Sequence, residues 1–306
     1  MRTISLEKAA ELLEKGSILP SDFTLAGELT PRQSRKLLDM VVQQSDFLQR
    51  ITRHPMDDLK VEVPVIDVAD RALKQIPEGT EPSSSDWVGV TYKGRILHAE
   101  EVDLPFAVVY STLIVWKKSG EDIEKKVANM MAKRFANDLV DLGFNGDSAS
   151  SDNFLKLNDG WTKIAKTDSD THKVNFTSES LTKWSQRLEA VISALPEKYH
   201  GKAVLVMRTG DYRALVKEIA GDNAGAYQIL LSGETKEFLG YEIIPVPYVP
   251  TEHVMFTPIE NFVFGYLVPI RRYRRDNSMA RQIEYLYSMH VDFQFSVADA
   301  VAIGHP

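Results

Sequence analysis

Residues 119–147 read SGEDIEKKVANMMAKRFANDLVDLGFNGD, and this stretch decides the fold. Its apolar side chains recur every four residues, which predicts one amphipathic helix. The apolar face consists of Ile123, Val127, Met131, Phe135 and Leu139, flanked by Met130 and Leu142. Ser119 suits the N-cap, and Gly143 suits the left-handed residue that follows a helix. About 23 residues make a rod of roughly 35 Å, so we expect a supporting helix without catalytic side chains.

The composition is that of an ordinary globular protein without cysteine chemistry. The chain has 306 residues and no cysteine, which excludes disulfides and thiolate nucleophiles. No apolar run reaches the ~18 residues of a membrane span, and the first residues do not form a signal peptide, so we expect a cytoplasmic location and no membrane partner. The net charge of −7 argues against a dedicated nucleic-acid-binding protein, which is usually basic.

Side chains that could carry chemistry are sparse. The seven histidines show no metal-binding spacing, and the chain has no Gly-x-Ser-x-Gly motif. Asp57–Asp58 near His54 fits a solvated turn, and Glu100–Glu101 next to His98 fits a projecting hairpin. The sequence therefore predicts a protein that is not an enzyme, with no catalytic, cofactor-binding or metal-binding residues and no cofactor.

Two helices are predicted before residue 56. The first covers residues 5–16, and the second begins at Thr30–Pro31 because threonine caps helices and proline suits the first helical position. The second helix is expected to end at His54–Pro55. Its apolar side is formed by Leu37, Leu38, Val41, Phe47, Leu48 and Ile51.

From residue 60 to residue 116 the pattern predicts strands. Alternating valines at 61, 63 and 65 fit a half-buried strand. Residues 92–97 and 101–104 are expected to form a hairpin, with Lys93–Gly94 as a candidate turn. Residues 71–90, between the valine strand and this hairpin, are rich in proline, glycine and serine. We therefore expect a long projection or a surface loop there.

After residue 147 a small α/β unit is predicted. A helix is expected from about residue 177 to 195, a buried strand at 202–208 and a second helix from residue 209. Strands are expected at 241–246 and 254–257, followed by return strands at 261–270 and 282–295. Alternating strands and helices indicate a unit with a central sheet.

The order of these pieces resembles that of a known family. The long helix runs into Asn145–Gly146–Asp147, a polar loop and then Gly160–Trp161. This succession resembles the major capsid proteins of tailed phages, which have the Hong Kong 97-type fold. Residues 104–124 resemble the strand that leads into the spine helix of that family, and Phe238–Pro250 resembles a strand of its axial domain.

The resemblance implies an α+β fold with an N-terminal arm, an extended β-hairpin loop, a peripheral domain with a long spine helix, and an α/β axial domain. It also implies a division of the chain. The segments are the arm (1–55), peripheral-domain strands (56–118) with the extended loop at about 70–104, spine helix and peripheral domain (119–200), axial domain (201–260), and return strands of the peripheral domain (261–306).

Four arginines surround Tyr273 in the strongest local cluster of charge, and we predict that they contact neighbouring subunits. The cluster consists of Arg271, Arg272, Arg274 and Arg275. Arginine pairs well with carboxylates and with phosphates, so DNA contact is the alternative. Two further candidate intersubunit contacts, Lys93 and Trp87, belong to the extended loop.

The resemblance implies a shell protein that assembles through hexamers and pentamers into an icosahedral phage head around double-stranded DNA. The implied location is the virion, after assembly in the host cytoplasm. Implied partners are other copies of the chain, DNA held by proximity, a portal and a separate scaffolding protein, with a decoration protein as a further candidate. The alternatives are an encapsulin-type compartment and an unrelated α+β enzyme or binding module.

Overall fold

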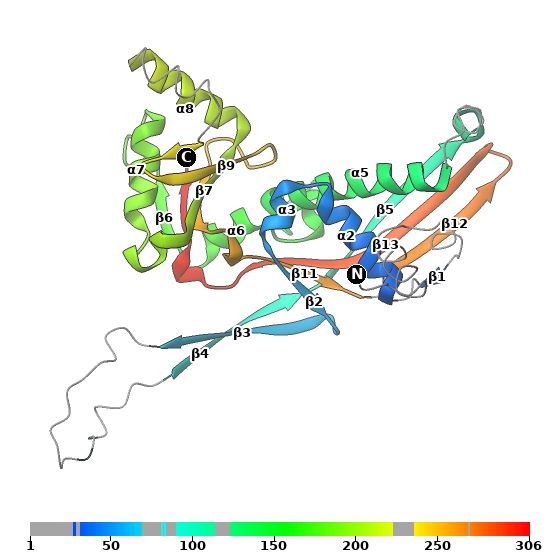
Figure 1. Cartoon of the computed structure of the whole chain (residues 1–306), viewed down its shortest axis with the longest axis horizontal. Coiled ribbons are helices and arrows are strands. Elements are labelled where there is room, and N and C mark those ends of the chain that lie inside the picture. Colours follow the sequence, from blue (N-terminus) through cyan, green and yellow to red (C-terminus); the bar gives the residue numbers. More distant parts are fainter. Residues whose placement is uncertain are drawn as a thin grey trace, which may run out of the picture.

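The computed structural model forms two lobes and a projecting ribbon (Figure 1). It describes residues 27–28, 31–68, 81, 83, 90–113, 123–222, 236–268 and 270–306. Several predictions fall wholly or partly outside these residues: the helix over 5–16, the first part of the arm, the first part of the extended loop at about 70–104, the N-cap Ser119 and the candidate contact Trp87.

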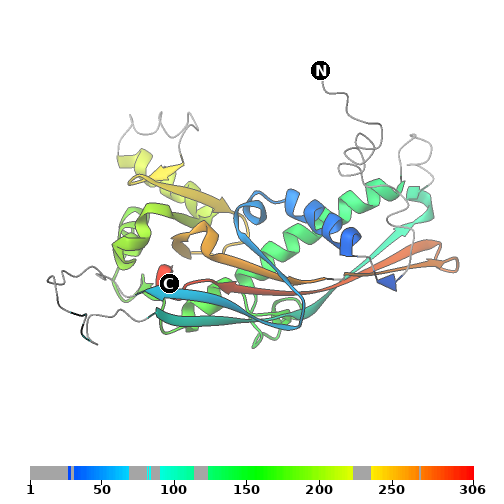
Figure 2. The same cartoon turned by 60° about the horizontal axis from the view of Figure 1, so that its bottom comes forward.

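A long sheet and three helices form the first lobe, which we call the spine lobe. The strands run in the order β1-β12-β13-β11-β2, and β5 also pairs with β13. They are β1 (Gly27–Glu28), β2 (Thr52–Met56), β5 (Glu100–Val109), β11 (Phe262–Leu267), β12 (Arg271–Asn277) and β13 (Gln282–Phe295). Helices α2 (Pro31–Gln43), α3 (Asp46–Arg50) and α5 (Ile123–Asn145) lie on one side of this sheet (Figure 2). The predicted return strands are confirmed by β11 and β13.

The long helix is confirmed as α5, with two corrections. The described members of its apolar face that are buried are Val127, Met131, Phe135, Leu139 and Leu142. Met130 is 45% exposed, so its assignment to this face is wrong. Gly143 lies inside the helix, which continues to Asn145. A Cβ on Gly143 would lie 2.5 Å from Cζ3 of Trp161, so the glycine serves close packing at this position.

A second sheet with two helices forms the other lobe, which we call the α/β lobe. Its strand order is β6-β14-β10-β7-β9-β8. The strands are β6 (His172–Asn175), β7 (Ala203–Arg208), β8 (Glu237–Phe238), β9 (Tyr241–Val246), β10 (Val254–Pro258) and β14 (Ala302–His305). The helices are α7 (Trp184–Ala194) and α8 (Thr209–Asp222). The predicted strands at 202–208, 241–246 and 254–257 are confirmed.

Both faces of this second sheet are buried, because alternate residues of its strands enter different cores. In β7, Val204 and Val206 join the core that also contains α5. Leu205 and Met207 join a separate core with α7 and α8. Burial on both sides explains why residues 203–207 form an unbroken apolar run.

The lobes do not follow the predicted boundaries at residues 200 and 260. Strand β6 and helix α7 precede residue 200 yet belong to the α/β lobe, and β14 returns to it after β13. The spatial neighbours of these segments are distant in the sequence, so local patterns did not indicate them. The shorter helical elements are η2 (Leu155–Leu157), α6 (Trp161–Thr167), η3 (Glu197–Lys202), η4 (Ile259–Asn261) and η5 (Ala298–Ala300).

Residues 31–55, predicted as part of an arm, pack into the core of this chain. Leu38 and Leu48 are almost fully buried there. The predicted single helix is broken, because the Ser45 side chain accepts a hydrogen bond from the Leu48 N–H and caps the separate helix α3. His54–Pro55 lies in β2, which runs parallel to β11.

Strands β3 (Lys60–Val68) and β4 (Val90–His98) form a two-stranded ribbon that leaves the body of the molecule (Figure 1). The predicted pairing of residues 92–97 with 101–104 is wrong, because β4 pairs with β3 and β5 pairs with β13. Lys93–Gly94 lies within β4, opposite Val65 and Pro64, and forms no turn.

Candidate assembly surfaces

The loop after α5 folds back onto the helix and fixes the start of α6. The Gly146 N–H donates to the Leu142 carbonyl at 2.8 Å, and the Gly160 N–H donates to the Gly146 carbonyl at 2.9 Å. A Cβ on Gly160 would lie 2.6 Å from the Gly143 carbonyl oxygen. Only glycine allows this approach of two backbone segments, so the Asn-Gly-Asp turn and Gly160 form one packed junction.

Trp161 lies at the centre of an aromatic cluster beside this junction. Its ring centroid is 5.3 Å from those of Phe144 and Phe262 and 4.9 Å from that of Phe293, in edge-on geometries. The indole Nε1–H donates to the Gln294 carbonyl at 3.1 Å. The cluster joins the end of α5 and the start of α6 to β11 and β13.

The ribbon is anchored in this chain at its base. Leu97 and Ala99 are buried and pack with Met56 and Val263 in a small core of their own. On the opposite face of β4, Ile96 is 62% exposed. A two-stranded ribbon is marginally stable alone, so the anchored base holds it while an apolar side chain remains in solvent.

Polar contacts fix the direction in which the ribbon leaves the body. The His98 backbone N–H donates to Asp292 Oδ2 at 2.7 Å, and Asn158 Nδ2 donates to the other oxygen of the same carboxylate, Asp292 Oδ1, at 3.1 Å. Burial raises the pKa of Asp292 to about 6, although these hydrogen bonds favour its charged form. Arg95 forms an ion pair with Asp168 beyond the end of α6. The ribbon is therefore tied to β13 and to the loops flanking α6.

The arginine cluster lies on β12, and Arg272 does not reach its surface. Arg272 is 1% exposed, and its guanidinium carbon lies 5.4 Å from the ring centroid of Tyr285 and 5.7 Å from that of Tyr287. Strand alternation turns this side chain toward the sheet's buried face, where it packs on the two rings. The prediction that Arg272 contacts a neighbouring subunit is wrong.

Arg275 has its ion-pair partner within this chain. Its Nε lies 2.9 Å from Glu284 Oε2, while Asn277 and Gln282 each donate to Oε1 at 2.8 Å. Hydrogen bonds from Gln282, Asn277 and Arg275 lower the pKa of Glu284 to about 2. Arg271 and Arg274 are exposed and stay predicted contacts. The backbone of Lys93 lies in β4.

A groove lined by both apolar and charged side chains crosses the outer face of the spine-lobe sheet. Tyr273 lies opposite Leu286, which lies opposite Pro105 on the next strand. These three residues line an open groove of ≈ 560 Å³, and Tyr273 is 47% exposed. Alternation within β12 was the available signal, because it places Tyr273 on the face opposite Arg272.

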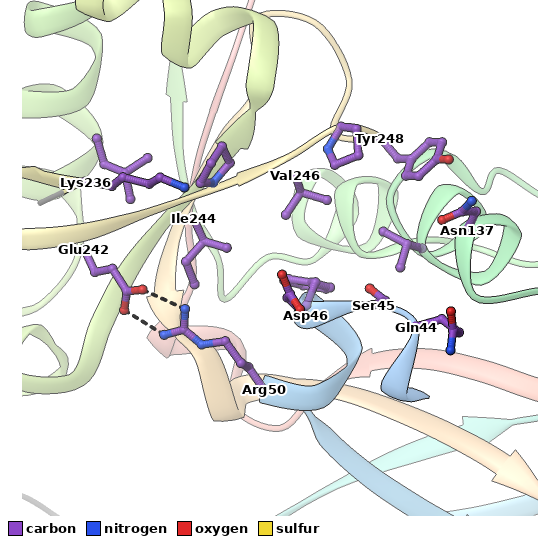
Figure 3. A pocket seen from close by; sticks show the side chains of 15 residues that line it. Gln44, Ser45, Asp46, Arg50, Asn137, Lys236, Glu242, Ile244, Val246 and Tyr248 are labelled. Atoms are coloured by element: carbon purple, nitrogen blue, oxygen red, sulfur yellow. Dashed lines mark hydrogen bonds and ion pairs between the residues drawn. The ribbon is translucent and has the colours of Figure 1, made fainter. Parts of the chain in front are cut away.

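A cleft separates α3 and α5 from β9 of the α/β lobe (Figure 3). Its volume is ≈ 360 Å³, and its lining includes Val140 and Ile244. Arg50 of α3 spans the cleft and makes two hydrogen bonds of 2.7 Å to the carboxylate of Glu242. The hydrogen bond to Arg50 lowers the pKa of Glu242. This bidentate pair joins the two lobes at one end of the cleft.

The residues that the structure describes offer little for metal or membrane chemistry. Among them, no group of three His, Cys, Asp or Glu side chains could hold a metal ion. His98 Nδ1 lies 3.0 Å from Glu100 Oε1, but both side chains are about half exposed at the ribbon base. No helix within the described ranges is long and apolar enough to span a membrane.

Comparison with known proteins identifies relatives along nearly the whole chain. A family model described as phage major capsid protein, P2 family, matches residues 10–303. The chain is 22% identical over 322 residues to the capsid proteins of Escherichia phage P2, covering 94% of this chain and 88% of the relative.

Solved capsid structures share the fold. A chain of the satellite phage P4 procapsid, whose structure includes the size determination protein, matches with a TM-score of 0.65 and 19% identity, covering 89% of this chain and 98% of that chain. A chain from the capsid of an empty GTA particle matches with a TM-score of 0.60 and 16% identity, and the match covers 84% of this chain and 94% of that chain. The predicted α+β fold of Hong Kong 97 type is confirmed. Because the family model matches nearly all of the 306 residues of this chain, the chain belongs to the P2 family of phage major capsid proteins.

Proposed function

We propose that this capsid subunit builds its shell by laying its ribbon on a neighbouring copy. A major capsid protein forms the icosahedral shell of the phage head, and this chain is such a structural subunit. The main support for this proposal is the burial pattern of the ribbon. Leu97 at its base is fully buried in this chain, while Ile96 on the other face is 62% exposed. A surface of this kind is stabilised when another copy covers it.

The remaining segments divide the work of assembly. The spine lobe forms the peripheral domain, and the α/β lobe forms the axial domain around the centres of hexamers and pentamers. Many weak contacts, repeated around each ring, add up to a stable shell through multivalency.

The shell encloses double-stranded DNA by proximity, because a net charge of −7 supplies no general attraction for phosphates. A separate scaffolding protein, a portal and a decoration protein complete the assembly in the host cytoplasm, and the chain itself catalyses no reaction. The procapsid of satellite phage P4 includes a size determination protein, which supports accessory partners. The family match favours a phage head over an encapsulin-type compartment or an unrelated enzyme or binding module.

Changing both Arg271 and Arg274 to glutamine tests the proposed contacts between subunits. Both side chains are exposed on β12, and ion pairs at an interface rim are screened by salt. We expect the double variant to give several-fold fewer shells than the wild type at low salt, with a smaller deficit at higher salt, where the wild-type pairs are screened as well. Shells are counted by sedimentation and electron microscopy after expression without a genome.

Arg275→Gln is the matched control, because the partner of Arg275 is Glu284 of the same chain. We expect this variant to assemble nearly as well as the wild type. A normal yield of empty shells from the double variant would refute the interface role of Arg271 and Arg274. If the same variant then lost packaged DNA, the two arginines would be assigned to contacts with phosphates.

A further inference from the structure

The β8–β9 hairpin of the α/β lobe has an unusual residue at its tip. Phe238 and Tyr241 pair across the hairpin, and Leu239 and Gly240 form the two-residue turn. The φ angles are 50° at Leu239 and 83° at Gly240. Turns with two positive φ angles favour asparagine, aspartate or glycine, because a larger side chain is strained in this conformation. Leucine is therefore an unfavourable choice for the backbone here.

Leu239 is also unfavourably placed with respect to solvent. Its side chain is 64% exposed. Among the described residues of the α/β lobe, no other large apolar side chain is exposed. The stem below it is firmly held, since Phe238 and Tyr241 pack against the lobe's core. The Arg50–Glu242 pair fixes the next residue of β9 (Figure 3). The hairpin therefore presents an apolar side chain on a rigid support.

Both costs would be smaller with asparagine at position 239, and no contact within the described part of the subunit offsets them. A molecule that covers Leu239 would offset both. We propose that Leu239 is an apolar contact between this subunit and a second copy of the chain in the shell. This inference rests on assembly of the chain into a shell, but it does not depend on the ribbon or on the arginines of β12.

The surroundings of Leu239 favour another copy over nucleic acid. Lys236, Glu237 and Glu242 are exposed or partly exposed polar neighbours on the hairpin, and Glu242 is already paired with Arg50. The opposite charges of the other two residues, Lys236 and Glu237, nearly cancel, so the phosphates of a nucleic acid would be attracted only weakly. An apolar side chain inside a polar rim is the usual composition of a protein–protein contact. In a ring the contact repeats at every subunit, which multiplies its effect.

The test compares Leu239→Asn with Leu239→Met in the full-length chain. Asparagine relieves the backbone strain and removes the apolar group, while methionine keeps both. We expect the unassembled asparagine variant to melt at the wild-type temperature or a few degrees higher. We also expect it to need an about tenfold higher concentration to form rings and shells. The methionine variant should assemble within about twofold of the wild type.

Sedimentation and native mass spectrometry across a concentration series provide the assembly measurement, and thermal unfolding provides the stability measurement. Wild-type-like assembly of the asparagine variant would overturn the proposal. An equal loss of assembly in the methionine variant would overturn it too, because that variant keeps the apolar contact. Failure of the wild-type chain to form shells when its scaffolding protein is present would instead refute the proposed shell function, so the two failures are distinguishable.

Discussion

Met131→Asp is expected to unfold or precipitate the subunit, whereas Met130→Asp is expected to leave it folded. Met131 is 3% exposed in the core under α5, while Met130, the preceding residue of the same helix, is 45% exposed. Replacing a buried methionine by a small residue costs about 2–5 kcal/mol, and an unpaired carboxyl group in an apolar core costs more. Since a typical protein is stable by about 5–15 kcal/mol, most of the stability should be lost.

Urea unfolding of soluble, unassembled subunits provides the measurement, together with the soluble fraction after expression. Met130→Asp is the matched control, because it introduces the same charge into the same turn of helix and should cost less than about 1 kcal/mol. If the two variants unfolded at the same urea concentration, α5 would not bury the face assigned to it.

Trimming the ribbon is expected to abolish shells while the subunit stays folded. The trimmed chain lacks residues 64–94 and joins Val63 to Arg95 through Asn-Gly, since these two residues lie opposite each other in the β3–β4 register. Asn-Gly closes a two-residue hairpin. The variant keeps Leu97 and Ala99, whose burial anchors the ribbon base. We expect cooperative melting close to that of the wild type, with no shells detectable in sedimentation.

The end point of the deletion matters for this experiment. A deletion reaching residue 100 would remove Leu97 and Ala99 from their core and would confuse folding with assembly. With the shorter deletion, loss of cooperative melting would mean that the ribbon beyond residue 63 belongs to the subunit's own core. Shells of normal yield would mean that the ribbon makes no essential contact with neighbours.

The sequence predicted α5 well because its periodicity extends over six turns, but it misjudged the width of the buried face. The face includes Ala128, Ala132 and Ala136, each at most 3% exposed, which follow the larger apolar residues by one position. Alanine contributes little to a hydrophobic pattern, although its small size allows close packing. Met130 lies on the other side of the stripe, about 100° before Met131 around the helix.

Strand pairing could not be predicted from local patterns. The alternation in residues 92–97 indicated a strand, and β4 confirms it, but the partner is β3 and not the next strand. Strand β5 pairs with β13, about 180 residues further along the chain. Alternation gives the two faces of a strand and carries no information about its neighbours, so a local hairpin was the simplest interpretation.

For a similar reason, the sequence did not show which of the four arginines in β12 is buried. Alternation within residues 271–275 correctly separated two faces of the strand, but it did not indicate which face was buried. The register against Tyr285 and Tyr287 decides this, and it buries Arg272. Leu239 gave no signal in the sequence, because its importance follows from a positive φ and from exposure, which only the folded hairpin shows.

Electron microscopy of particles from cells expressing the full-length wild-type chain together with its scaffolding protein tests the assignment to a phage head shell most directly. A subunit of this family should give closed icosahedral shells with pentamers at the vertices, hexamers between them and a mass in the megadalton range. The density should show each ribbon lying on an adjacent subunit. A population of monomers or small oligomers at every concentration would contradict the assignment.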